Sequence, residues 1–218
     1  MPPKTTNPAA PDLPEPDNLS IFKGNSLKPA QRVEETYIDG NCFVRSTADE
    51  LTIASSTLKR VSARESRWRN VRWRDVRVSA CDFANADWIG ANVSRVELID
   101  SRLTGVNLSE SKVADLRCVG CRFGQAWFQR SHFQTCRFER CDLTEVDFEW
   151  ADLRGAVFVA CDLRRARIIG AKLEGADLRG SQLQGLVAQP RDLRSAIIEP
   201  MQALDLAPIL GVVIADRL

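Results

Sequence analysis

Four cysteines separated by multiples of twenty residues are the side chains in this 218-residue chain whose type and spacing most readily suggest chemistry. They are Cys81, Cys121, Cys141 and Cys161, and Ser101 and Ser181 continue the series. Thiolates bind zinc and pair as disulfides, but a spacing of twenty does not match the close ligand spacing of zinc sites. We therefore expect a ladder of small buried side chains, with no metal and no cofactor.

Residues with catalytic potential are otherwise sparse. The single histidine, His132, is predicted to be exposed. Aspartates recur at equivalent positions (Asp82, Asp87, Asp142, Asp147, Asp152, Asp162 and Asp177), so they are interpreted as repeat residues that hydrogen-bond along a surface. The sequence has no P-loop, no G-x-G-x-x-G after a strand and no G-x-S-x-G. These observations predict a protein that is not an enzyme and has no catalytic residues.

The element that positions these side chains is a five-residue repeat. Every fifth residue from Ile38 to Leu183 is apolar, and the residue two places before each of these centres is never charged. Neither a helix nor a simple strand has a period of five. A short fixed repeat over most of a chain indicates a solenoid. In this register Trp68, Trp73 and six of the seven cysteines point inward, and Cys42 points outward.

The clearest repeats are Ala151-Asp152-Leu153-Arg154-Gly155, Cys161-Asp162-Leu163-Arg164-Arg165 and Ala176-Asp177-Leu178-Arg179-Gly180. They match an A(D/N)LxG consensus, so the chain resembles a pentapeptide repeat protein over about 150 residues. The resemblance implies an all-β fold, a right-handed quadrilateral β-helix with four repeats per coil. Thirty repeats then make about 7.5 coils, and at about 4.8 Å per coil the rod is about 36 Å long.

Composition divides the chain into three segments. Residues 1–32 contain seven of the ten prolines and are predicted to be a flexible Pro-rich arm, from which Ile21, Phe22 and Leu27 fold back over the first coil. Residues 33–198 form the β-helix, and 199–218 form a capping or dimerisation segment. The absence of a transmembrane-length apolar run and of a signal-peptide core, together with cysteines outside any disulfide framework, predicts a cytoplasmic protein without membrane contact.

The last segment contains a short helix over 201–207 and a strand-like apolar run over 208–214. It resembles the C-terminal module of the fluoroquinolone-resistance members of the family, which implies a homodimer joined through the C-termini. A segment that only caps the open end would leave a monomer. The residues expected to cap or dimerise are Met201, Leu204, Leu206, Ile209, Leu210, Val212 and Val213.

Two irregularities on the outer surface are candidate binding sites. The first is a basic collar of Lys59, Arg60, Arg64, Arg67, Arg69, Arg72, Arg74 and Arg77, which binds phosphates or an acidic protein unless acidic residues on neighbouring coils neutralise it. The second is a partner surface of Trp127, Trp150, Ile169, Asp147 and Glu149, since aromatic residues beside charges are typical of protein interfaces.

Three functions are consistent with these features. The leading interpretation is a scaffold that binds another protein, whose identity is unknown. The resemblance implies an alternative, a duplex-DNA mimic that binds DNA gyrase or topoisomerase IV and protects it from quinolones. However, the 23 basic and 20 acidic residues between Thr36 and Gly185 do not make the negative rod that mimicry requires. A second alternative is anion or nucleic-acid binding through the basic collar.

Overall fold

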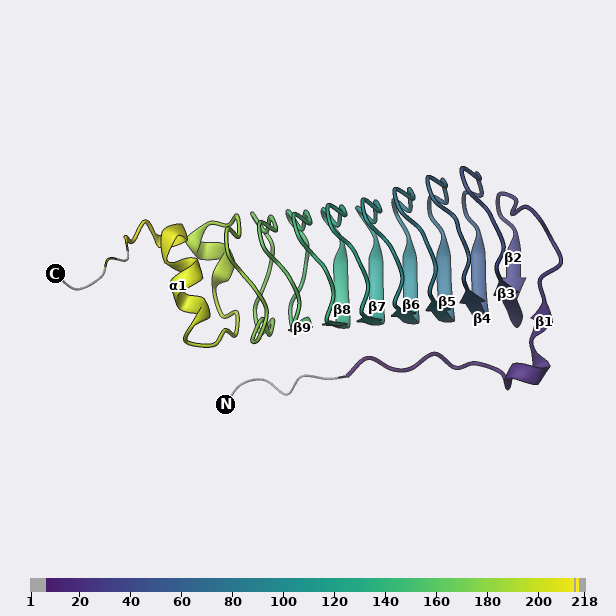
Figure 1. Ribbon diagram of the computed structural model, residues 1–218, viewed down its shortest axis with the longest axis horizontal. Coiled ribbons are helices and arrows are strands. Elements are labelled where there is room, and N and C mark those ends of the chain that lie inside the picture. The colour runs from purple at the N-terminus through teal and green to yellow at the C-terminus, as the bar shows by residue number, and fades with distance from the viewer. Residues whose placement is uncertain (1–6, 214, 216–218) are drawn as a thin grey trace.

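The computed structural model describes residues 7–213 and 215. It is a long stack of coils, and the strands of successive coils lie side by side in one parallel sheet (Figure 1). The sheet contains β1 (Ser20–Ile21), β2 (Arg32–Glu34), β3 (Thr36–Asp39), β4 (Thr52–Lys59), β5 (Arg72–Ser79), β6 (Asn92–Ile99), β7 (Lys112–Val119), β8 (His132–Glu139) and β9 (Val157–Val159). The expected β-helix of pentapeptide repeats is confirmed.

Each coil contains twenty residues, so residues twenty apart in the sequence form a column along the rod. Thr52 pairs with Arg72, Arg72 with Asn92 and Asn92 with Lys112. Isolated bridges continue the same register on the other faces, for example from Asn107 to Trp127. Backbone N–H and C=O groups pair with the coils above and below. The parts of each coil that lie outside the named strands therefore leave few backbone groups without a partner.

The corners explain the period of five. Every fifth residue from Ala30 to Gly185 has a positive φ, whether or not it is glycine. A left-handed residue turns the backbone sharply, so each pentapeptide makes one side of the coil and one corner. All thirty central apolar residues are buried, which confirms the inward register, and Trp68 and Trp73 are only 0% and 3% exposed.

The core has two aromatic sections separated by aliphatic coils. Trp68, Trp73, Phe83 and Trp88 pack together in the first section, and six phenylalanines from Phe123 to Phe158 pack in the second. Val93 and Val113 lie between them. An internal cavity of about 20 Å³ is present where the large indoles meet these smaller side chains, and Trp73 and Trp88 line one end of it.

Both ends of the stack are covered. At the first coil Leu27 is buried and Phe22 packs edge-on against Phe43 at 5.8 Å, as expected, whereas Ile21 is 72% exposed. At the other end lie η2 (Pro190–Leu193), α1 (Gln202–Leu206) and η3 (Ala207–Leu210). The helix expected over 201–207 is present as α1. The strand-like run expected over 208–214 is wrong in its described part, because η3 continues to Leu210, Gly211 ends it in a left-handed turn, and residues 212–213 form no strand.

The N-terminal arm leaves the first coil and runs back along the outside of the rod (Figure 1). It contains the short helix η1 (Pro16–Asn18), and β1 joins it to the sheet by pairing with β3. Among the described residues, no helix is long and apolar enough to cross a membrane.

Candidate functional site

The most exposed aromatic side chains of the rod are Trp127 and Trp150, which are 55% and 59% exposed. Trp127 occupies the middle of one side of a coil. Its N–H donates to the carbonyl of Val106 at 2.9 Å, and its own carbonyl accepts from the N–H of Leu108 at 2.8 Å. Because both hydrogen bonds fix this backbone to the preceding coil, the indole is held outward.

Trp150 occupies a corner, with φ of 60°. A bulky residue in the left-handed region costs about 1–2 kcal/mol. Its indole lies over Gly170 of the next coil, where a Cβ would meet Cε3 of Trp150 at 2.6 Å. Since Gly170 leaves this space open, the ring lies along the rod and more than half of its surface stays in contact with solvent.

Polar groups lie beside the two indoles. Asp147 accepts a hydrogen bond from Nε2 of Gln129 at 2.8 Å and lies 3.8 Å from Arg167, which also pairs with Glu149. Ile169 is half-buried, and its carbonyl accepts the N–H of Trp150 at 3.0 Å. A surface depression adjoins this group and is lined by Ser109, Glu110, Gln129, Arg130, Glu149 and Trp150. Exposed aromatic surface beside donors and acceptors is typical of protein interfaces.

The basic collar is largely neutralised by carboxylates of neighbouring coils. Arg67 lies 2.6 Å from Asp49, Arg69 lies 2.7 Å from Asp87 and Arg77 lies 2.9 Å from Glu97. Arg60 pairs with Asp39, and Arg64 and Arg74 have acidic groups within 3.9 Å. Within the described residues, Lys59 and Arg72 are the members of the collar without an ion pair. The collar is therefore a set of pairs between coils rather than a free positive surface.

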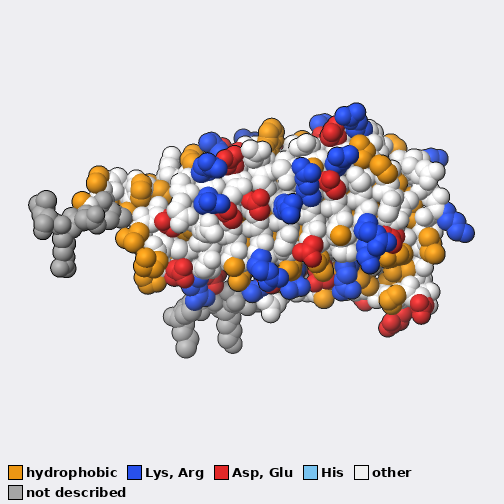
Figure 2. Space-filling view, in the orientation of Figure 1, with side chains coloured by type: hydrophobic (Ala, Val, Ile, Leu, Met, Phe, Trp, Pro, Cys, Tyr) orange, Lys and Arg blue, Asp and Glu red, His pale blue; other side chains and the backbone are white. Residues whose placement is uncertain are grey.

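The strongest acidic run, Asp142, Glu145, Asp147 and Glu149, is also engaged. Glu145 pairs with Arg165 at 2.9 Å, and Asp142 accepts the hydroxyl of Thr144 at 2.7 Å. Asp147 and Glu149 share Arg167, as described above. Lys and Arg side chains are interspersed with Asp and Glu along the visible face of the rod (Figure 2). Neither sign of charge dominates this face.

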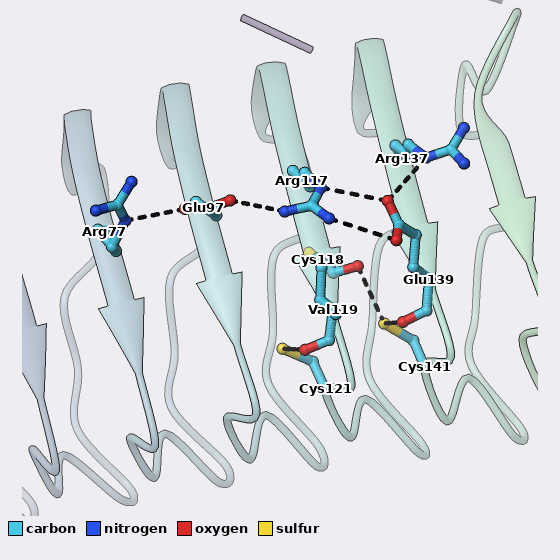
Figure 3. A network of polar contacts seen from close by, with 9 residues as sticks. All are labelled: Arg77, Glu97, Arg117, Cys118, Val119, Cys121, Arg137, Glu139 and Cys141. Carbon is cyan, nitrogen blue, oxygen red and sulfur yellow. Dashed lines mark hydrogen bonds and ion pairs between the residues drawn. The ribbon is translucent and has the colours of Figure 1, made fainter. Parts of the chain in front are cut away.

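A ladder of alternating charges crosses β5 to β8 (Figure 3). Arg77 bonds Glu97 at 2.9 Å, and Arg117 bonds Glu97 at 2.8 Å and Glu139 at 3.2 Å. Arg137 completes it with a contact of 2.8 Å to Glu139. Arg137 and Glu139 share β8, and the other pairs join neighbouring coils, so they stabilise the stacking of the coils and leave little unpaired charge for an external ligand.

The cysteines behave as small core residues. All seven are free, and only Cys42 is exposed, as predicted. The thiol of Cys141 donates to the carbonyls of Cys118 at 3.6 Å and Glu139 at 3.4 Å (Figure 3). Cys118 and Cys121 form a C-x-x-C sequence, which the spacing of twenty did not reveal, but both thiols are fully buried. Burial raises the pKa of the Cys81 thiol to about 11 and that of Cys136 to about 12, which makes these thiols poor nucleophiles.

The recurrent aspartates bind side chains of their own face. In Asp152-Leu153-Arg154 the guanidinium of Arg154 contacts both carboxylate oxygens, at 2.9 and 2.6 Å, and Asp162 with Arg164 and Asp177 with Arg179 repeat this geometry. These hydrogen bonds lower the pKa of all three carboxyls. His132 lies 3.2 Å from Asp152 and is half-exposed. No group of three or more side chains that could hold a metal occurs in the described part of the chain.

The C-terminal segment has an inner and an outer face. Leu206 is buried against the last coil, and Ile209 is half-buried against the same core. Met201, Leu204, Leu210, Val212 and Val213 are between 51% and 88% exposed, and hydrophobic side chains gather at this end of the rod (Figure 2).

A residue that the sequence did not indicate fixes the cap. The side-chain nitrogen of Gln202 donates to the carbonyls of Leu178 at 2.7 Å and Ser181 at 2.6 Å, and the side chain is 3% exposed. Its oxygen accepts the N–H of Glu199 at 2.9 Å. Gln202 therefore supplies a donor to the carbonyl of Ser181 where the stack ends, and a second donor to the carbonyl of Leu178, which also accepts the N–H of Ser181 at 3.2 Å.

Comparisons with known proteins find a matching family model and similar solved structures. A family model described as pentapeptide repeats matches eight copies, over residues 79–112, 117–155 and 141–180. A solved structure of trypsin-treated QnrB1, a plasmid-mediated fluoroquinolone resistance protein, is similar with 18% identity and a TM-score of 0.45, over 89% of this chain and 95% of that one. HetL from the cyanobacterium Nostoc sp. strain PCC 7120, involved in heterocyst differentiation regulation, has 16% identity and a TM-score of 0.32, over 78% and 87% of the two chains. Comparison with curated proteins finds no match.

Proposed function

Because the chain belongs to the pentapeptide repeat family, we propose that it is a non-enzymatic scaffold that binds another protein through the surface of Trp127 and Trp150. The observation that carries the proposal is the pair of exposed indoles. Trp150 is the one aromatic residue among the positive-φ corners from Ala30 to Gly185, and it is 59% exposed. Exposed aromatic side chains are typical of protein interfaces.

The charge distribution favours a protein partner over a nucleic acid. Phosphate binding requires unpaired cations, and most arginines of the basic collar already bind carboxylates. By contrast, two indoles with Asp147 and Gln129 beside them provide apolar area together with hydrogen-bonding groups. We expect binding that is insensitive to salt between 50 and about 300 mM, because the apolar contact is not screened.

The exposed side chains of the C-terminal segment support a homodimer joined end to end. Leu204, Leu210 and Val213 point away from the last coil, while Leu206 fills the cap. Substituting Leu204→Asp together with Leu210→Asp should give a monomer by light scattering, because both side chains are exposed and the cap does not require them. An unchanged mass would show that another surface joins the subunits or that the protein is already a monomer.

Binding to DNA gyrase or topoisomerase IV is the second candidate, suggested by the C-terminal module discussed above. The paired state of Asp142, Glu145, Asp147 and Glu149 opposes it, because a duplex mimic must present free negative charge. Inhibition of gyrase supercoiling by the purified protein would favour this candidate, and we expect none. The buried free thiols support a reducing compartment such as the cytoplasm.

The proposal is tested by affinity capture with three forms of the full-length protein. The double variant Trp127→Ala with Trp150→Ala should lose a partner that the wild type retains in stoichiometric amount. The matched control is Val159→Ala, which removes exposed apolar surface elsewhere on the rod and should retain the partner. Equal retention by all three forms would exclude the tryptophan surface as the binding site.

A further inference from the structure

The N-terminal arm is bound to the rod by its backbone. The N–H of Ala9 donates to Oδ1 of Asp115 at 3.1 Å, and the N–H of Asp12 donates to Oδ1 of Asp75 at 3.0 Å. The arm runs along the stack in the direction opposite to that in which the coils are added (Figure 1). Asp75 and Asp115 belong to one corner column, in which Arg95 lies between them.

The spacing of these two contacts matches the rod. Asp75 and Asp115 are two coils apart, which is about 9.6 Å at the strand spacing of a sheet. Ala9 and Asp12 are three residues apart, and three residues of polyproline II helix rise about 9.3 Å. A polyproline II segment laid along the rod therefore offers an N–H group to every second residue of the column, which here are Asp75 and Asp115.

The prolines have the same period. Pro8, Pro11 and Pro14 are three residues apart, and a polyproline II helix has three residues per turn, so their rings lie along one side of the segment. All three are half-buried, whereas Ala9 and Asp12 are exposed. Pro11 and Pro14 line a groove against the rod together with Tyr37, Thr57, Lys59 and Arg77. One ridge of the segment packs on the rod, and its backbone N–H groups reach the carboxylates.

The rod side of this contact is preorganised. Nε and Nη2 of Arg95 each lie 2.6 Å from a carboxylate oxygen of Asp75, which is 5% exposed with the arm in place. The carboxylate is therefore fixed by the rod itself before any segment binds. Because the two hydrogen bonds involve backbone N–H groups, they select conformation and proline spacing rather than particular side chains between the prolines.

We propose that the column of Asp75, Arg95 and Asp115, with the adjoining groove, is a recognition site for polyproline II segments that have proline at every third residue. The chain's own residues 8–16 occupy it until a partner segment of the same chemistry replaces them. This site does not involve Trp127 or Trp150, so the proposal is tested independently of the partner surface. A tethered segment has a high effective concentration, so exchange requires either a tight partner segment or a weakened arm.

The first test is hydrogen exchange of single amides by NMR on the full-length protein. In the variant Asp115→Ala, the amide of Ala9 should exchange at least ten-fold faster than in the wild type. The matched control is Asp100→Ala, an aspartate at another left-handed corner, which removes a carboxylate at the same backbone conformation. Equal exchange at Ala9 in wild type and Asp115→Ala would overturn the assignment.

The second test uses a fluorescent peptide with the sequence of residues 7–19. The full-length variant Pro8→Gly with Pro11→Gly and Pro14→Gly keeps the length of the arm but loses its polyproline II preference, which frees the site. By fluorescence anisotropy the peptide should bind this variant at least ten-fold more tightly than the wild type. A peptide of the same composition without the three-residue proline spacing should not bind. Absence of binding to the triple variant, or equal binding of both peptides, would refute the proposal.

Discussion

The guanidinium of Arg95 contacts both carboxylate oxygens of Asp75, one coil away, at 2.6 Å each. These hydrogen bonds hold the pKa of Asp75 below its usual value, although burial acts in the opposite direction, and the backbone N–H of Asp12 adds to the lowering. A carboxyl whose pKa is depressed in the folded state stabilises the fold above its unfolded pKa of about 3.9. That contribution is lost as the pH falls through the folded pKa.

Removal of this pair should make the rod more sensitive to acid. In Arg95→Met the carboxylate stays buried without its main donor, so the pKa of Asp75 rises and about 1–3 kcal/mol of stability is lost at neutral pH. The midpoint of acid unfolding, followed by circular dichroism, should move to higher pH. Arg45→Met removes an exposed pair with Glu65 and should leave the midpoint unchanged. The same midpoint in both variants would contradict the role of Arg95.

The inward register predicts opposite results for two adjacent residues. Leu153 is 1% exposed, and Leu153→Asp would bury an unpaired charge, which costs several kcal/mol and should prevent folding. Arg154 points outward and pairs with Asp152, so Arg154→Ala should cost less than about 1 kcal/mol. Thermal melts and expression yields of the two variants compare them directly. Similar tolerance of both would mean that the inside and outside positions are assigned wrongly.

The cavity between the two aromatic sections should accept an additional methylene group. Its volume of about 20 Å³ corresponds to about 0.5 kcal/mol, and one buried methylene contributes about 0.8 kcal/mol. Val113→Ile should therefore raise the free energy of unfolding by about 0.5–1 kcal/mol in urea titrations. Val78→Ile is the control, because Val78 is fully buried and does not line the cavity, so the larger side chain should destabilise by about 1–3 kcal/mol. Destabilisation by both substitutions would show that the cavity is closed in solution.

The cap should depend on Gln202. Gln202→Ala leaves the carbonyl of Ser181 without this donor, at a cost of about 1–3 kcal/mol, while the carbonyl of Leu178 keeps the N–H of Ser181. Hydrogen exchange should accelerate first in the last coils, because the stack opens from its end. Gln184→Ala removes an exposed hydrogen bond to Asp205 and should change little. Unchanged exchange in the Gln202 variant would exclude a role for Gln202 in closing the stack.

The register of the repeat could be predicted because it rests on a local rule, one apolar residue in every five. The corners with positive φ have the same period of five. The ion pairs of the basic collar could not be predicted from the sequence. Arg67 and Asp49 come together only because the coils stack, and the length and direction of each side chain determine which carboxylate it contacts. The prolines of the arm led to the prediction of a flexible segment. That the three-residue spacing of Pro8, Pro11 and Pro14 matches a distance of two coils can be recognised only from the structure of the rod. The role of Gln202 could not be predicted either, because the sequence does not show which backbone carbonyls lie at the end of the stack.

Site-specific photocrosslinking tests the proposed scaffold function most directly. A photoreactive phenylalanine derivative placed at position 127 of the full-length protein should give one discrete covalent adduct in cells, and the adduct should persist at raised salt. The same group at position 159, which is exposed on another face, should give none. Adducts from both positions, or from neither, would contradict the assignment of protein binding to the Trp127 and Trp150 surface.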